Sequence, residues 1–222
     1  MSKIIQALMF VAVCVGPSLA TEITYKSQSR YNKLTFQSGD GDQSARDDAS
    51  GFDRFDSNLS RSFQSGESAA SSSATQTSEF SAMSIVADGS TAGSFGPPAG
   101  SSNASGQSYF EVEFSIDVAS PYSLDLSSDN SEYGQVRFVG PSFNIDQQVG
   151  VSGGDPLSIS ETGTVQPGDY SLLIDINTSG FMNGTVGQYS LDFQLVPEPC
   201  VSPLLILAMG FAWLRVTRKL RA

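Results

Sequence analysis

The side chains able to do chemistry are few in kind: the chain has no histidine, and its two cysteines, Cys14 and Cys200, lie in apolar stretches near its ends. The lack of histidine removes the usual general base and the commonest metal ligand at neutral pH. No nucleophile elbow, phosphate-binding loop, zinc spacing or dinucleotide-binding turn occurs. Carboxylates remain, and two at a suitable separation suffice for glycoside hydrolysis. We therefore expect no enzymatic activity, with a carboxylate-dependent glycoside hydrolase as the open alternative.

One acidic segment has the spacing of a cation ligand set. Asp40, Asp42 and Ser44 place oxygen atoms at alternate positions. Oxygens in this arrangement can face one hard cation such as calcium, although the glycine and glutamate positions of an EF-hand loop hold other residues here. Two interpretations stay open, a calcium site and an acidic turn between strands. Calcium is the one cofactor that the sequence suggests.

The central part of the chain is more acidic than the whole, whose net charge is −11 at neutral pH. Lys3 and the cations of the carboxyl end lie outside residues 21–196, whereas the only acidic residue outside them is Glu198. Such a surface repels nucleic acid and anionic lipid, so we expect no nucleic-acid partner. The acidity either keeps an exported protein soluble or suits binding of calcium or a cationic matrix component.

Residues 1–20 have the features of a secretory signal peptide. Lys3 supplies the positive start, an apolar stretch follows, and Pro17 precedes the small residues Ser18 and Ala20. We predict cleavage by signal peptidase after Ala20. A permanent first membrane helix is disfavoured because the apolar stretch is shorter than the roughly 20 residues of a span. A lipoprotein, lipidated at Cys14, is a further alternative.

The carboxyl end has three parts in a fixed order. Pro197, Glu198 and Pro199 precede an apolar stretch, and basic residues close the chain: Arg215, Arg218, Lys219 and Arg221. The apolar stretch predicts a short transmembrane helix at about residues 200–216, whose apolar part is about 22 Å long. The basic cluster stays cytoplasmic by the positive-inside rule, which places residues 21–196 outside the inner membrane.

This order of motif, short apolar segment and arginine-rich tail resembles the PEP-CTERM sorting signal. The resemblance covers residues 197–222 and implies export by a bacterium that makes exopolysaccharide. It also implies an exosortase-type membrane protease as partner, with Pro197, Glu198 and Pro199 as its recognition residues. The two prolines hold the backbone extended, which suits a protease substrate. The alternative is a plain tail anchor that is never processed.

Residues 21–196 alternate apolar and polar side chains with a period of two, which predicts β-strands. We therefore expect an all-β fold, an antiparallel β-sandwich of jelly-roll-like type, flanked by a signal helix and a short transmembrane helix. Turn signals of glycine, proline and asparagine separate the runs. The predicted strands are 23–26, 33–36, 110–118, 122–126, 136–139, 157–159, 170–176 and 189–195.

Two features of this central region carry specific expectations. The run from Val165 to Tyr170 contains a Pro-Gly turn directly before a strand, which predicts a tyrosine corner, with the hydroxyl bonded to upstream backbone. Residues 38–107 are rich in serine, alanine and glycine, so they are either a disordered linker or strands that face a thin core. In the second interpretation we expect one continuous β domain, with Gly96–Ser108 as a long exposed loop.

These observations favour a structural or interaction protein of the cell surface or exopolysaccharide matrix, first anchored in the inner membrane as a precursor. A carbohydrate- or calcium-binding module is the main alternative. An exposed row of Tyr122, Tyr133 and Phe143 would favour that alternative, because aromatic rings on a flat face contact sugars.

Overall fold

The computed structural model describes residues 21–38, 42–65, 68–95, 102–130, 132–150, 156–179 and 185–197. The predicted signal helix over residues 1–20 and the predicted membrane helix at about 200–216 fall outside these ranges. In the described part of the chain, no helix is long and apolar enough to cross a membrane.

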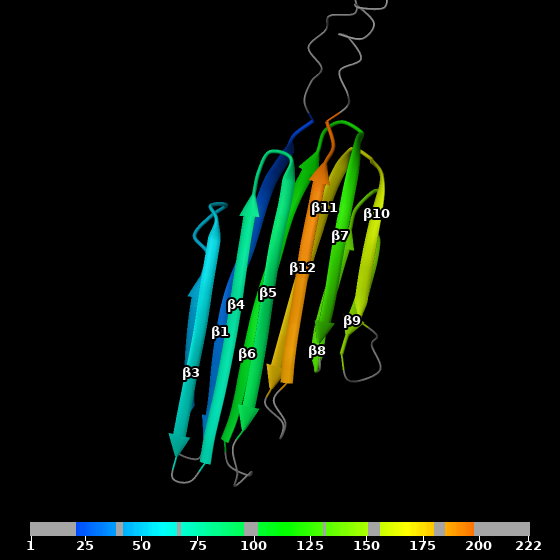
Figure 1. Cartoon of the computed structure of the whole chain (residues 1–222). Coiled ribbons are helices and arrows are strands. Elements are labelled where there is room, and N and C mark those ends of the chain that lie inside the picture. Colours follow the sequence, from blue (N-terminus) through cyan, green and yellow to red (C-terminus); the bar gives the residue numbers. More distant parts are fainter. Residues whose placement is uncertain are drawn as a thin grey trace, which may run out of the picture. The chain divides into compact units, whose positions relative to one another are not determined.

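Two six-stranded antiparallel sheets pack face to face, which confirms the predicted β-sandwich (Figure 1). Sheet A has the strand order β2-β1-β6-β11-β8-β9, and sheet B the order β10-β7-β12-β5-β4-β3. Successive strands alternate between the two sheets from β5 to β8, and again from β9 to β12, as in jelly-roll-like folds. The strands are β1 (Ile23–Ser38), β2 (Gln43–Asp48), β3 (Phe55–Ser65), β4 (Ser68–Phe80), β5 (Ser84–Phe95), β6 (Ser102–Ile116), β7 (Ser120–Asn130), β8 (Tyr133–Val139), β9 (Asn144–Val149), β10 (Leu157–Val165), β11 (Gly168–Ser179) and β12 (Thr185–Leu195).

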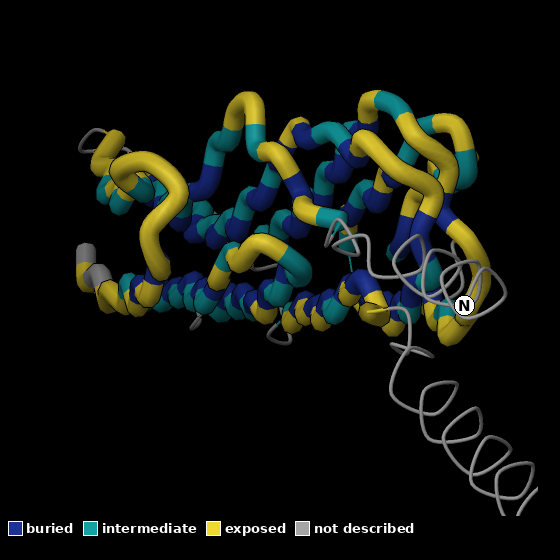
Figure 2. The backbone as a smooth tube through the Cα atoms, turned by 90° about the horizontal axis from the view of Figure 1, so that it is seen from above, coloured by how far each residue is buried: buried dark blue, intermediate teal, exposed yellow. Residues whose placement is uncertain are grey.

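The period-two pattern sets which side chains face the space between the sheets. In β6, Phe110, Val112, Phe114 and Ile116 are buried, whereas the residues between them are partly or fully exposed. Figure 2 shows the same alternation of buried and exposed residues along the strands of both layers. Val118, predicted to continue this strand, lies beyond its end and is 47% exposed.

Aromatic rings fill the larger of two hydrophobic clusters. Phe138 stacks on Phe143 with ring centroids 4.1 Å apart, and Phe114 stacks on Tyr170 at 5.4 Å. Phe193 of sheet B meets Phe138 edge-on at 5.7 Å. Edge-to-face and offset pairs of this kind add to the stabilisation from burial.

The predicted tyrosine corner is confirmed within this aromatic cluster. The Tyr170 hydroxyl donates a hydrogen bond to the carbonyl oxygen of Gln166, at 2.5 Å. Its ring covers Gly140, where an ideal Cβ would come within 2.2 Å of a ring carbon. Gly168, in the Pro-Gly turn just before the strand, has a φ of 145°, a backbone conformation that favours glycine.

The serine- and alanine-rich region forms strands that face a thin core. β2, β3, β4 and β5 lie wholly within residues 38–107, and β6 begins at Ser102. The prediction of a loop over Gly96–Ser108 is therefore wrong from Ser102 onward, because these small residues pair with β1. A second, smaller cluster of buried apolar residues lies here: Leu34, Phe36, Ala70, Ala74 and Ala104.

A belt of buried polar side chains lies between the two hydrophobic clusters. Across the inner face of sheet B, Ser57, Gln76, Gly89, Tyr189 and Ser128 are successive cross-strand partners. Sheet A contributes Asn32 and Ser108, which are themselves paired. Asn32 donates to the Ser57 carbonyl oxygen at 3.2 Å, and Ser108 to that of Thr75 at 3.3 Å. We call the six side chains Asn32, Ser57, Gln76, Ser108, Ser128 and Tyr189 the polar belt.

The first and last strands are fixed by one turn at the same end of the sandwich (Figure 1). The Ile23 amide donates to the carbonyl oxygen of Ala82 at 2.7 Å, and the Leu195 amide to that of Met83 at 2.8 Å. The Val196 amide adds a bond to the Pro121 carbonyl oxygen at 2.9 Å. Among the described residues, the backbone hydrogen bonds of the sandwich thus run from Ile23 to Val196, and the Thr21 hydroxyl adds a side-chain bond with Ser120.

Candidate functional site

The three predicted calcium ligands are only partly within the described residues. Asp40 lies outside them, Asp42 is exposed, and Ser44 belongs to β2, where it pairs with Thr35. The next outward residue of this strand is Arg46, whose guanidinium forms an ion pair with Asp48 at 2.6 Å. Within the described ranges, no three histidine, cysteine or acidic side chains are grouped to hold a metal ion.

Most of the predicted processing residues lie outside the described ranges. These are Ala20, Glu198, Pro199 and the basic tail of Arg215, Arg218, Lys219 and Arg221. Pro197 is described and exposed, and it directly follows Val196, which within the described residues is the last to form a backbone hydrogen bond. The predicted recognition motif therefore begins two residues after the end of β12.

The exposed aromatic row that would mark a sugar-binding face is not formed. Tyr122 and Phe143 are 8% and 5% exposed and meet edge-on in the core at 5.1 Å. Tyr133 alone is exposed, at 48%. The sequence pattern could not tell that Phe143 is buried, because it lies in a short turn between β8 and β9, where side chains do not alternate between two faces.

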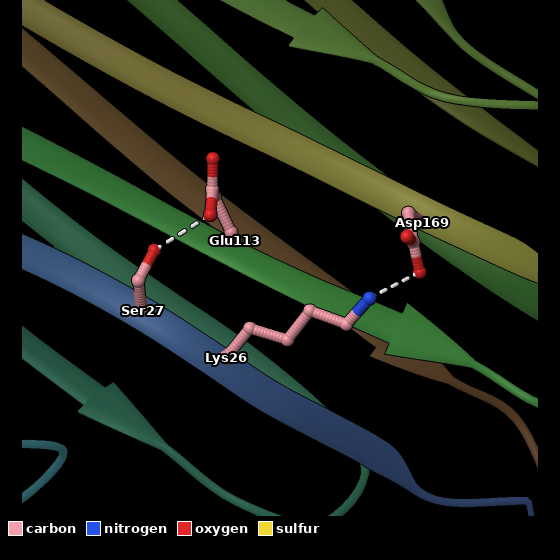
Figure 3. A network of polar contacts seen from close by, with 4 residues as sticks. All are labelled: Lys26, Ser27, Glu113 and Asp169. Carbon is pink, nitrogen blue, oxygen red and sulfur yellow. Dashed lines mark hydrogen bonds and ion pairs between the residues drawn. The ribbon is translucent and has the colours of Figure 1, made fainter.

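Polar side chains on the outer face of sheet A are largely satisfied by one another. Figure 3 shows Lys26 of β1 reaching across β6 to Asp169 of β11, at 2.5 Å, and Ser27 bonded to Glu113 at 2.8 Å. The register shift between Tyr25 and Ser27 leaves Lys26 without a cross-strand partner in β6. This arrangement links three strands and uses the charged groups of Lys26, Asp169 and Glu113.

The same face carries an aromatic stack in which Tyr31 lies between Tyr109 and Arg46. Tyr31 and Tyr109 are cross-strand partners with ring centroids 4.8 Å apart and nearly parallel planes. The Arg46 guanidinium covers the other side of Tyr31, at 3.8 Å from the ring centroid. The stack therefore attaches the edge strand β2 to the sheet rather than offering a platform for a sugar ring.

Beside this stack, Asp175 is half-buried. Burial raises the pKa of its carboxyl group, and the hydrogen bond from the Gln107 amide, at 2.9 Å, acts in the opposite direction. Tyr109, its cross-strand neighbour, donates to Glu111 at 2.8 Å. These bonds use the polar groups at the centre of the face.

Sheet B differs, because its outer face contains a polar groove of about 620 Å³. The groove crosses β4, β5, β12 and β7 and reaches the start of β10. We call this the sheet B groove; its outward side chains are Thr75, Thr77, Asp88, Ser90, Ser127, Asp129, Ser158, Gln188 and Ser190.

Cross-strand register arranges these side chains in two rows. Thr77, Asp88, Ser190 and Ser127 form one row of successive partners. Thr75, Ser90, Gln188 and Asp129 form the other. Among the described contacts, the only hydrogen bond between side chains of these rows joins Thr75 to Ser90, at 2.6 Å. The groove therefore presents hydroxyl, amide and carboxylate groups that remain available to a ligand.

Small residues beneath the groove bring the sheets close together. An ideal Cβ on Gly89 would come within 2.2 Å of the Tyr189 ring and 2.8 Å of the Ser108 hydroxyl. One on Gly106 of sheet A would lie 2.6 Å from the carbonyl oxygen of Ser73 in sheet B. The two glycines thus allow the Tyr189 ring to lie directly on β5 and the backbone of β6 to approach that of β4, and these contacts support the floor of the groove.

Two acidic residues that face each other across neighbouring strands lie outside the groove. Asp125 and Asp192 are cross-strand partners, which places their Cβ atoms about 5 Å apart. The two groove carboxylates belong to Asp88 of β5 and Asp129 of β7, with β12 between them, and they lie in different rows. The spacing of strands and of residues along a strand places these two residues about 12 Å apart.

The sequence contained a signal for the groove that the strand prediction did not use. β4, β5, β7, β10 and β12 contain no lysine or arginine, and each contains serine or threonine. Comparisons of the chain with protein-family models, with curated proteins and with solved structures found no match.

Proposed function

We propose that the chain is an exported protein of the cell surface or extracellular matrix, processed through its carboxyl-terminal sorting signal. Its precursor is held in the inner membrane by the short helix, with the basic tail in the cytoplasm. An exosortase-type protease then acts at Pro197, Glu198 and Pro199. The β-sandwich serves as a non-catalytic interaction domain.

The observation that best supports this proposal is where the sandwich begins and ends. In the part of the chain that the structure describes, its first backbone bond is made by Ile23, close after the predicted cleavage at Ala20, and its last by Val196, directly before Pro197. The twelve described strands run from Ile23 to Leu195. Removal of residues 1–20 and of the sorting signal would therefore cost the sandwich none of its strands.

Cleavage is tested by mass. The full chain is expressed in a host that has an exosortase and in the same host without it, and the intact masses are compared. We expect a loss of mass close to that of residues 199–222 only where the protease is present, and we expect Glu198→Gln to abolish it. Glu22→Gln, an exposed change at the other end of the fold, is the matched control. An identical mass in both hosts would refute processing.

A further inference from the structure

We propose that the sheet B groove binds a polysaccharide segment that carries amino groups. The proposal names a partner for the interaction domain and rests on the proposed function for where that partner is met. Binding itself is a property of the folded sandwich.

The groove has the size and the functional groups for a hydroxyl-rich chain. Its volume is about 620 Å³, and its two rows offer hydroxyl, amide and carboxylate groups. Neighbouring strands lie about 4.8 Å apart, so the four strands that form the rows span about 14 Å. Hydrogen bonds to several sugar units can form along this length.

The negative charge of the groove favours a ligand that carries protonated amino groups. Asp88 and Asp129 lie in the groove, and Glu79, Asp125 and Asp192 lie beside it on the same outer face. No lysine or arginine occurs in the five strands around it. A field of one sign attracts cationic groups and repels carboxylate or sulfate groups, so an acidic polysaccharide is disfavoured.

The floor of the groove is held by contacts within the sandwich that need no ligand. Gly89 is covered on its inner side by the Tyr189 ring, and Ser108 donates to the Thr75 carbonyl oxygen. A backbone held in this way loses little conformational entropy on binding. The groove lacks an outward aromatic ring, because Tyr189 points inward, so polar contacts and charge supply the affinity.

Binding is measured by titration calorimetry on the full-length chain in a mild non-ionic detergent. The ligands are glucosamine oligomers, below the pKa of the sugar amine, and N-acetylglucosamine oligomers of the same length. We expect the free-amine oligomers to bind at least about tenfold more tightly, a difference of about 1.4 kcal/mol. Equal binding of the two, or no binding of either, would overturn the proposal.

Two double variants separate a site from a general charge effect. Asp88→Asn with Asp129→Asn removes both groove carboxylates, and the loss in affinity should be about tenfold or more. Asp125→Asn with Asp192→Asn makes the same change of charge on the same face outside the groove, and should cost less than about threefold. Equal losses would show that net charge alone attracts the ligand.

A lysine oligomer of matched charge tests for recognition of the sugar. If it binds as tightly as the glucosamine oligomer and loses as much in the groove variant, the face collects cations without recognising a glycan, and the proposal fails. These measurements do not depend on processing, because the purified chain retains its tail. An unchanged mass in the exosortase host would therefore refute the sorting proposal and leave the groove result standing.

Discussion

Gly89 and Tyr189 are cross-strand partners in sheet B, and the tyrosine ring lies so close over the glycine that a Cβ there would be 2.2 Å from a ring carbon. The Ser108 hydroxyl of sheet A lies 2.8 Å from the same point. Gly89 is thus the position at which a side chain would force the two sheets apart and raise the floor of the groove.

Gly89→Ala should therefore lower the free energy of unfolding by about 1–3 kcal/mol, the usual cost of overpacking. For a chain of this size, that is a fall in Tm of about 3–10 °C. Urea and thermal denaturation measure it. Ser190→Ala, an exposed change at the next residue of β12 after Tyr189, should alter stability by no more than about 0.5 kcal/mol. If both variants are equally stable, the close packing is incorrect.

Tyr170→Phe removes the hydroxyl of the tyrosine corner and keeps the ring on Phe114 and Gly140. The Gln166 carbonyl oxygen then loses its donor, and we expect a loss of about 1–2 kcal/mol in the free energy of unfolding. Tyr122→Phe is the control, because its hydroxyl bonds the carboxylate of Glu161 on the edge strand β10. A smaller loss for the control is expected in urea denaturation, and the reverse order would contradict the role of the corner.

Arg30 is 2% exposed and connects sheet A to the segment between β2 and β3. Its guanidinium donates to the carbonyl oxygens of Gly51 and Asp53, at 2.6 and 2.9 Å, and to the Ser78 hydroxyl, at 2.9 Å. Lysine cannot reproduce this fork. Arg30→Lys should lower the free energy of unfolding by about 2–4 kcal/mol.

The matched change on an exposed arginine is Arg46→Lys. Its ion pair with Asp48 is solvent-exposed, so the expected loss is below about 1 kcal/mol. Chemical denaturation of both variants under one set of conditions decides between them. Similar losses would mean that the buried fork contributes no more than a surface pair.

Gln76 of the polar belt is 1% exposed, and neither of its amide atoms has a hydrogen-bond partner among the described residues. Gln76→Met keeps the length of the side chain and removes the cost of desolvating the amide, so we expect a gain of about 1 kcal/mol in stability. Ser78→Ala, two residues along the same strand, should instead destabilise, because Ser78 accepts from Arg30. A destabilised Gln76→Met would show that the amide is satisfied in solution.

Stability should fall in alkaline solution. Burial raises the pKa of Tyr122 to about 12 and raises those of Tyr25, Tyr109 and Tyr189 further, whereas an unfolded tyrosine titrates near pH 10. Above about pH 10 the folded state therefore binds more protons than the unfolded state, and the free energy of unfolding decreases with pH. This stabilisation is complete below about pH 10 and is lost as pH rises toward 12.

Arg30 opposes this trend, because burial lowers its pKa, but it is one group against several. Urea denaturation between about pH 8 and pH 11 measures the slope, and ultraviolet titration of the phenolates measures the pKa values. Tyr109→Phe, which removes one of these groups, should reduce the slope. A free energy of unfolding that stays constant across this range would contradict the burial of the tyrosines.

The period-two alternation of β6, β11 and β12 was sufficient to predict strands and their inward faces. A strand with large apolar residues at every second position has one apolar face, and the low-energy arrangement packs that face against the other sheet. The Pro-Gly turn before Tyr170 was equally informative, because a turn of that kind and a strand-opening tyrosine form the corner locally. These features depend on residues close together in sequence.

The strands of residues 38–107 were left undecided by the sequence for a physical reason. In β4, serine and alanine stand at both inward and outward positions, so little contrast in hydrophobicity marks the buried face. Their state depends on pairing with β3 and β5 and on the close approach of Gly106 to Ser73. Such long-range contacts leave no periodic signal in the chain.

By itself, the sequence determined the acidic charge, the absence of histidine, the absence of cysteine from residues 21–196, and the strands with large apolar faces. Only the tertiary structure decided that Tyr122 and Phe143 are buried, that a polar belt separates two cores, and that a hydroxyl- and carboxylate-lined groove crosses sheet B. Composition and alternation are local properties of the chain, whereas these features arise from register between strands far apart in sequence, which is fixed when the two sheets pack.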